Sequence, residues 1–214
     1  STCPGDRVMP SRSCLVFPST FLLAIVLLAS TGRADDVAAV VEFEPGDHVA
    51  YIGNGLPDRM QHAGYLETYI HALHPEHGLV FRNLGFPGDE LTTRARSQDF
   101  GTPKDWLTKC KADVIFCFFG FNEAFNGPPG LDGFRTDLKS QIDELQSEKY
   151  NGESPPRLVF FSPIKHENLN DPNLPDGSEN NKNLMKYTEA MREVCAAANV
   201  GFVDLYAISE QSDD

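Results

Sequence analysis

Three short polar loops hold the residues of this chain that could do chemistry: Gly53–Asp58, Gly85–Glu90 and Gly120–Glu123. Each loop follows a short apolar run and combines glycine with a carboxamide or carboxylate side chain. Glycine lets a backbone N–H approach a ligand oxygen closely. Two such N–H groups and one carboxamide would form an oxyanion hole, which stabilises the negative charge that develops during acyl transfer. The loops therefore predict a site for an acyl ligand.

The third loop ends the most apolar stretch of the chain. Val114–Phe119 contains only apolar residues and shows no alternation, which is typical of a short strand buried on both faces of a parallel sheet. Ligands of open α/β sheets bind at the carboxyl ends of such strands. Asn122 lies at that end, and the alternative interpretation is a turn that its own side chain closes.

The rest of the chain alternates between apolar runs and amphipathic stretches. We expect four more strands and four helices: strands 48–53, 79–84, 157–162 and 201–206, and helices 59–74, 107–110, 131–148 and 180–199. A further helix is expected to start at Asp89, with Asp89 as its cap and Asp58 as the cap of the first helix. This alternation predicts an α/β fold with three layers and a five-stranded parallel sheet, in the flavodoxin-like order 2-1-3-4-5.

The N-terminal part predicts export. Arg7 and Arg12 precede the apolar run Leu15–Ala29, and small residues follow it, as in a secretory signal covering residues 1–34. The apolar run is shorter than the roughly 20 residues that span a bilayer, although an uncleaved anchor is the alternative. Met9 is a candidate for the true start. We expect a lead-in over 35–45 and one domain over 46–214. After cleavage we expect no stable membrane span, and therefore a secreted or periplasmic protein.

Charge and cysteine content exclude several partners and cofactors. The formal net charge is −13, with 18 basic and 31 acidic residues, which argues against nucleic acid as a partner. The predicted domain has three cysteines and no Cys-x-x-Cys-His motif, so neither a disulfide framework nor a covalent haem is expected, although one disulfide is possible. His71 and His74 have no evident third ligand, so no metal is predicted.

The three loops together resemble the SGNH (GDSL) hydrolase family, over about residues 46–206. Gly53-Asn-Gly-Leu56 matches the Gly-Asp-Ser-Leu turn, Asn83–Asp89 matches the block with the oxyanion glycine, and Gly120–Glu123 matches the Gly-x-Asn-Asp block with Glu in place of Asp. Two further runs, Asp58–His62 and Leu174–Asn181, resemble the version of this module found in large secreted proteins of planctomycete-type bacteria.

The resemblance implies roles for six residues. Gly88 and Asn122 would form the oxyanion hole with the backbone N–H of Gly55, and Asn54, Asp89 and Glu123 would line the pocket. Gly55 stands where the family has its nucleophilic serine. The family's Asp-x-x-His block after the last strand is also absent, which we interpret as a truncated C-terminus.

These departures leave three hypotheses open. Losing nucleophile and base removes about 10⁶-fold of the rate in a serine hydrolase. The first hypothesis is an esterase-class domain acting on small-molecule or carbohydrate esters, impaired or inactive as it stands. The second is a non-catalytic carbohydrate- or ligand-binding module of a larger protein, and the third a purely structural domain. Ser162 and His166, four residues apart, are an alternative pair for catalysis.

Overall fold

The structure is a computed structural model that describes residues 41–211, all of which belong to one compact unit. The predicted signal segment 1–34 and the last three residues lie outside this range. None of the helices within the range is both long and apolar enough to cross a bilayer.

Five parallel strands form a single sheet in the order β2-β1-β3-β4-β5. Their bounds are β1 His48–Gly53, β2 Val80–Asn83, β3 Val114–Phe118, β4 Arg157–Phe161 and β5 Gly201–Val203. The predicted α/β class and strand order are therefore confirmed. Because all strands run in parallel, the loops after β1, β3 and β4 leave the sheet at the same edge.

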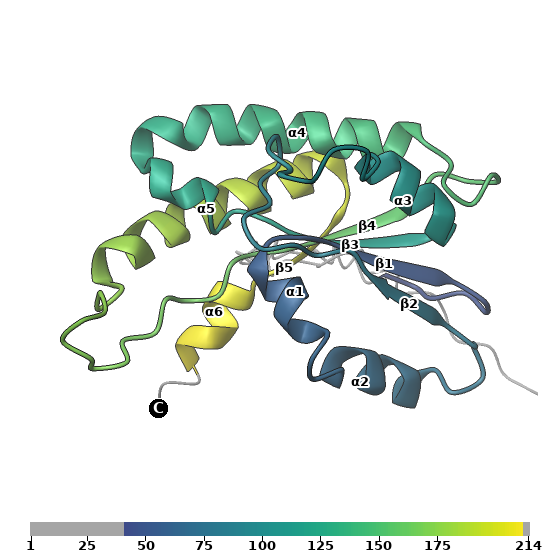
Figure 1. Cartoon of the computed structure of the whole chain (residues 1–214), viewed down its shortest axis with the longest axis horizontal. Helices are drawn as coiled ribbons and strands as arrows, with labels where there is room; N and C mark the ends of the chain where they lie inside the picture. The colour runs from purple at the N-terminus through teal and green to yellow at the C-terminus, as the bar shows by residue number, and fades with distance from the viewer. Residues whose placement is uncertain (1–40, 212–214) are drawn as a thin grey trace, which may run out of the picture. The chain divides into compact units, whose positions relative to one another are not determined.

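Six α-helices cover the sheet: α1 Gly55–Met60, α2 Tyr65–Leu73, α3 Pro103–Cys110, α4 Leu131–Ser147, α5 Ser178–Ala198 and α6 Leu205–Glu210. Two short 3₁₀ turns, Glu123–Asn126 and Pro128–Gly130, lead into α4. Helices α3, α4 and α5 lie on one face of the sheet, and α1, α2 and α6 lie on the other (Figure 1).

The central strand explains the stability of this three-layer arrangement. Ile115 and Cys117 of β3 pack in the core beneath α3–α5, whereas Phe116 and Phe118 pack in the core on the α1–α2 side. All five β3 residues are at most 4% exposed. A strand buried on both faces has no polar side, which is why the sequence of β3 does not alternate.

The predicted first helix is wrong in its bounds. It begins earlier, at Gly55, because the Asn54 side-chain oxygen caps it by accepting from the Leu56 N–H at 3.2 Å. The chain then breaks at Gly64, which has a left-handed backbone, before α2 starts. Asp58 lies inside α1 and is not its cap; it accepts a hydrogen bond from the Gln61 side chain instead.

Two further predictions fail at acidic residues. No helix starts at Asp89, because its carboxylate is used by Arg96; the next helix is α3, capped by Thr102. The last strand ends at Val203 rather than 206, because the Asp204 carboxylate accepts from the Ala207 N–H at 2.8 Å and starts α6.

Gly53 provides a test of how tightly β1 and β3 approach each other. Its φ is +131°, and an added Cβ would lie 2.0 Å from the Phe118 carbonyl oxygen. We expect Gly53→Ala to lower the free energy of unfolding by about 3 kcal/mol, since rigid backbone cannot move away. Urea denaturation measures this. The matched control is Gly133→Ala, in open space on α4, which should stabilise by about 0.5 to 1 kcal/mol; equal effects would contradict the close approach.

Candidate functional site

A cavity of about 570 Å³ opens at the carboxyl edge of the sheet. It is lined by the turn between β1 and α1, by the loops after β2 and β3, and by the residues directly after β4. Gly55, Gly88 and Asn122, the three proposed oxyanion donors, all line it, and so does Asn54. The strand order thus brings into one cavity residues that are 67 positions apart in the chain.

Gly55 is the first residue of α1, so its N–H has no acceptor within the helix. No other acceptor for this N–H is found among residues 41–211. A Cβ at position 55 would meet no atom within 4 Å, and the backbone there is not in the left-handed region. The site could therefore hold a side chain without strain, and its absence leaves the cavity open.

Gly88 lies in a turn that is fixed to the first loop. Its φ is +85°, a conformation that residues other than glycine rarely adopt. The turn is closed by the Asp89 N–H, which donates to the Phe86 carbonyl, and is anchored by the Phe86 N–H, which donates to Gly53 at 2.9 Å. The Gly88 N–H itself has no acceptor in the described part of the chain, so it is available to a ligand.

Asn122 connects the third loop to the second. Its side-chain Nδ2 donates to the Asp89 carbonyl at 3.1 Å, and its oxygen does not cap the turn that follows. The alternative of a turn closed by this side chain is therefore not what the structure adopts. A carboxamide has a second N–H and an oxygen, which this contact leaves free for a ligand.

Asp89 does not line this cavity. Its carboxylate is 1% exposed and receives two hydrogen bonds from Arg96, at 2.6 and 2.8 Å, while Arg94 lies 3.7 Å away. It lines another cavity, of about 430 Å³, together with Phe86 of the second loop. A bidentate pair of this kind is among the strongest polar contacts, so Asp89 holds the loop that carries Gly88.

Glu123 also does not line the cavity, and its carboxylate binds backbone N–H groups near the loops that form it. Its two carboxylate oxygens accept from the Leu91 N–H at 3.0 Å and the Gly120 N–H at 2.8 Å. Burial raises the pKa of this carboxyl group above its ordinary value of 4.5, and the backbone hydrogen bonds partly oppose the shift. Its position indicates a structural role, joining the third loop to the residue directly after the second loop.

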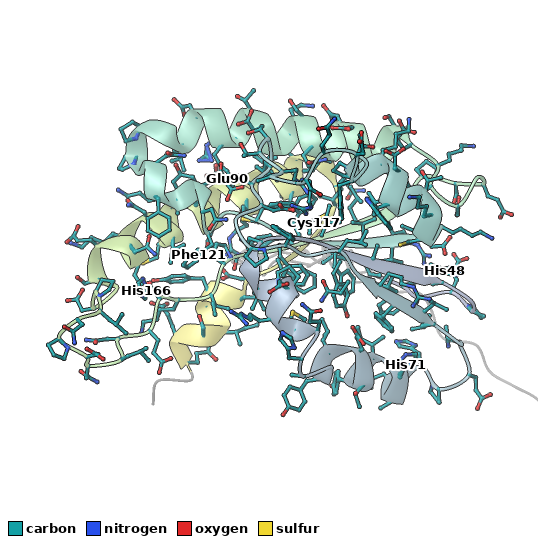
Figure 2. All side chains as sticks on the ribbon, viewed as in Figure 1. His48, His71, Glu90, Cys117, Phe121 and His166 are labelled. Atoms are coloured by element: carbon teal, nitrogen blue, oxygen red, sulfur yellow. The ribbon has the colours of Figure 1, made fainter. Side chains whose placement is uncertain are left out.

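Ser162 and His166 do not form a catalytic pair. Ser162 lines the cavity, but its hydroxyl donates to the Pro163 carbonyl at 3.1 Å and accepts from the Tyr206 N–H at 3.0 Å. The His166 ring lies 3.4 Å from the Asn180 side chain, and no histidine of the described range lines the cavity. His48, His71 and His166 lie in separate parts of the fold (Figure 2).

The described residues contain no cluster of three or more side chains suited to a metal ion. The His71 ring packs edge-on against the Phe81 ring. Cys110, Cys117 and Cys195 are free thiols. The cavity therefore relies on amides and on the one charged side chain that lines it, Arg59.

Comparison with known proteins identifies the family. The profile of the GDSL-like Lipase/Acylhydrolase family matches residues 46–214. The chain belongs to this family. The comparison with curated protein sequences found no match.

Solved structures with this fold include a catalytic mutant of Axe2, an acetylxylan esterase from Geobacillus stearothermophilus, with TM-score 0.59, 16% identity, and 81% of this chain and 83% of that chain covered. BT4096, a gut microbial diltiazem-metabolizing enzyme, is similar with TM-score 0.56, 17% identity, and 82% and 41% covered. The acetyl xylan esterase AlAXEase has TM-score 0.55, 15% identity, and 76% and 79% covered. At these identities the likeness concerns the fold.

Sequence reasoning missed Arg59 and Arg96. Arg59 follows Gly55 by four residues, so a helix starting at Gly55 would have placed both on one face, but the helix was expected to begin only at Arg59. Arg96 lies in an irregular segment, and no local pattern indicates that it pairs with Asp89.

The Asp89–Arg96 pair should make a large contribution to stability. Removing one charge of a buried pair leaves the other unpaired, so we expect Asp89→Asn to lower the free energy of unfolding by about 3 kcal/mol. The matched control is Asp143→Asn, which breaks the exposed pair with Lys139 on α4 and should change stability by less than about 0.5 kcal/mol. Chemical denaturation of both variants measures the difference, and a neutral Asp89→Asn would contradict the role given to this pair.

The raised pKa of Glu123 should make the free energy of unfolding depend on pH. Because its pKa is raised in the folded state, its favourable contribution is present below the unfolded value of 4.5 and is lost as pH rises through the folded value. Wild type should therefore lose stability relative to Glu123→Gln as the pH rises above 4.5. Urea denaturation at several pH values tests this, and a difference independent of pH would refute the shifted titration.

Proposed function

We propose that this domain binds acylated carbohydrates or related esters in the cavity at the sheet edge, and that it no longer hydrolyses them through a serine. The observation that carries this proposal is Gly55. It lines the cavity at the start of α1, where the Gly-Asp-Ser-Leu turn of the family would present its nucleophile, and it has no side chain.

The surrounding groups favour retained binding. The free N–H groups of Gly55 and Gly88 and the carboxamide of Asn122 can donate to a carbonyl oxygen, which is the function of an oxyanion hole. The only hydroxyl side chain lining the cavity, that of Ser162, already has two protein partners. Two of the solved structures with this fold are acetylxylan esterases, which supports an acetylated carbohydrate as the ligand.

The same reasoning suggests the setting of the domain. The signal-like segment 1–34 supports secretion or export to the periplasm. The resemblance of Asp58–His62 and Leu174–Asn181 to planctomycete-type modules supports a role as one part of a larger secreted protein. Active ester hydrolysis is the second candidate function, and membership of an acylhydrolase family favours it.

Turnover and binding can be measured separately on the full chain. We expect hydrolysis of p-nitrophenyl acetate to be no faster than the uncatalysed reaction, because Gly55 supplies no side-chain nucleophile. Gly55→Ser fills open space with a hydroxyl and should fold normally. A wild-type rate well above the uncatalysed one would favour active hydrolysis and overturn the proposed loss of turnover.

Binding of acetylated xylo-oligosaccharides, measured by calorimetry, should weaken about 3- to 10-fold in Asn122→Ala, because one hydrogen-bond donor is lost. The matched control is Asn173→Ala, in an exposed loop where the side chain contacts only Asp171. Unchanged affinity in Asn122→Ala, or an equal loss in the control, would place the ligand elsewhere.

A further inference from the structure

We propose that Arg59 binds a carboxylate group of the ligand, so that this cavity selects acidic ligands over neutral ones. The inference rests on the proposed function, because it concerns the same cavity. Arg59 is the only ionisable side chain that lines the cavity, although the chain has 31 acidic residues. The cavity therefore carries one positive charge and no negative charge.

The position of Arg59 on α1 directs it toward the empty position at Gly55. Residues four apart in an α-helix lie on the same face, and helical side chains lean toward the N-terminus. Arg59 thus covers the turn of α1 that begins at Gly55. Gly55 has no side chain, so the space beside the free N–H groups of Gly55 and Gly88 is open. A ligand group bound to the Arg59 guanidinium could occupy this space.

Arg59 also differs from the other arginines in residues 41–211. Each of the others has a hydrogen bond or an ion pair with a protein oxygen: Arg82, Arg94, Arg96, Arg135, Arg157 and Arg192. No such contact is found for the Arg59 side chain within the described range. Its neighbour Asp58 is engaged by the Gln61 side chain at 3.0 Å. A guanidinium has five N–H donors, so an unused one in a cavity can bind a ligand.

The surroundings identify the ligand group as a carboxylate. Guanidinium binds carboxylate through two parallel hydrogen bonds. One cation matches a singly charged group better than a phosphate with nearly two charges. Apolar side chains such as Leu56, Phe121 and Ile164 line the same cavity and would contact the rest of the ligand. The carboxylate could belong to an acidic sugar of the carbohydrate or to a free carboxylic acid such as acetate.

Calorimetry on the full chain distinguishes these sources with three probes: acetylated xylo-oligosaccharide carrying a glucuronic acid, the same oligosaccharide without it, and sodium acetate. We expect the acidic oligosaccharide or acetate to bind, and we expect Arg59 to increase the affinity. Arg59→Gln should weaken that binding about 5- to 10-fold, and Arg59→Lys should weaken it less, because lysine keeps the charge but not the planar fork. Whichever probe responds identifies the source of the carboxylate.

Two controls make the effect specific. Arg82→Gln removes an exposed arginine of β2 that donates to the Phe81 carbonyl and does not line the cavity, so it should leave all affinities unchanged. Raising the salt concentration from about 50 mM to about 500 mM should weaken the acidic probe more than the neutral one, because exposed charges are screened. Thermal denaturation confirms that each variant is folded.

The outcomes separate this inference from the proposed function. If the neutral oligosaccharide binds as tightly as the acidic one and Arg59→Gln changes neither, the carboxylate proposal is wrong and the proposed function stands. If acetate binds through Arg59 and neither acetylated oligosaccharide binds, the carboxylate proposal holds and recognition of acylated carbohydrates is wrong. If no probe binds, both are overturned.

Discussion

The close contact between the ends of β1 and β3 is the constraint on which the site depends. Gly53 and Phe118 are partners in the sheet, and the Phe118 carbonyl accepts from the Asn54 N–H at 3.1 Å. Glycine is required because a Cβ would overlap that carbonyl. The contact fixes where β1 ends and therefore where α1 begins, so it sets the position of Gly55 at the cavity.

The other two loops are positioned by hydrogen bonds to this contact and to each other. Phe86 donates to Gly53, and the Asn122 side chain donates to the Asp89 carbonyl. Glu123 accepts from the N–H of Gly120 in the third loop and from the N–H of Leu91, directly after the second loop. The ion pair between Asp89 and Arg96 also fixes the second loop. Because protein groups satisfy these contacts before a ligand arrives, the donors are preorganised and little ordering cost remains for binding.

This arrangement is compatible with the function we propose, in which a hydrolase fold keeps a binding site without the family's reaction. The loops are held by backbone contacts and by Asp89, Asn122 and Glu123, none of which requires a serine at position 55. The scaffold tolerates either glycine or a residue with a side chain at this position, since an added Cβ would meet open space. Gly55 and Arg59 line the same cavity, so in the proposed function the glycine would leave room for the acidic group of a ligand.

The sequence by itself determined the fold class and the strand order, because β3 is apolar throughout and the helices alternate with strands at regular spacing. It also indicated which loops would meet, since parallel strands end at one edge. Only the tertiary structure decided which side chains face the ligand. Asp89 and Glu123 were expected to line the pocket, but neither does. Arg59 lines it, although the sequence pattern did not predict this. The physical reason is that a carboxylate binds the donors that the fold brings near it. Asp89 binds Arg96, 7 positions away, and Glu123 binds the Leu91 N–H, 32 positions away, and contacts at such separations leave no local pattern.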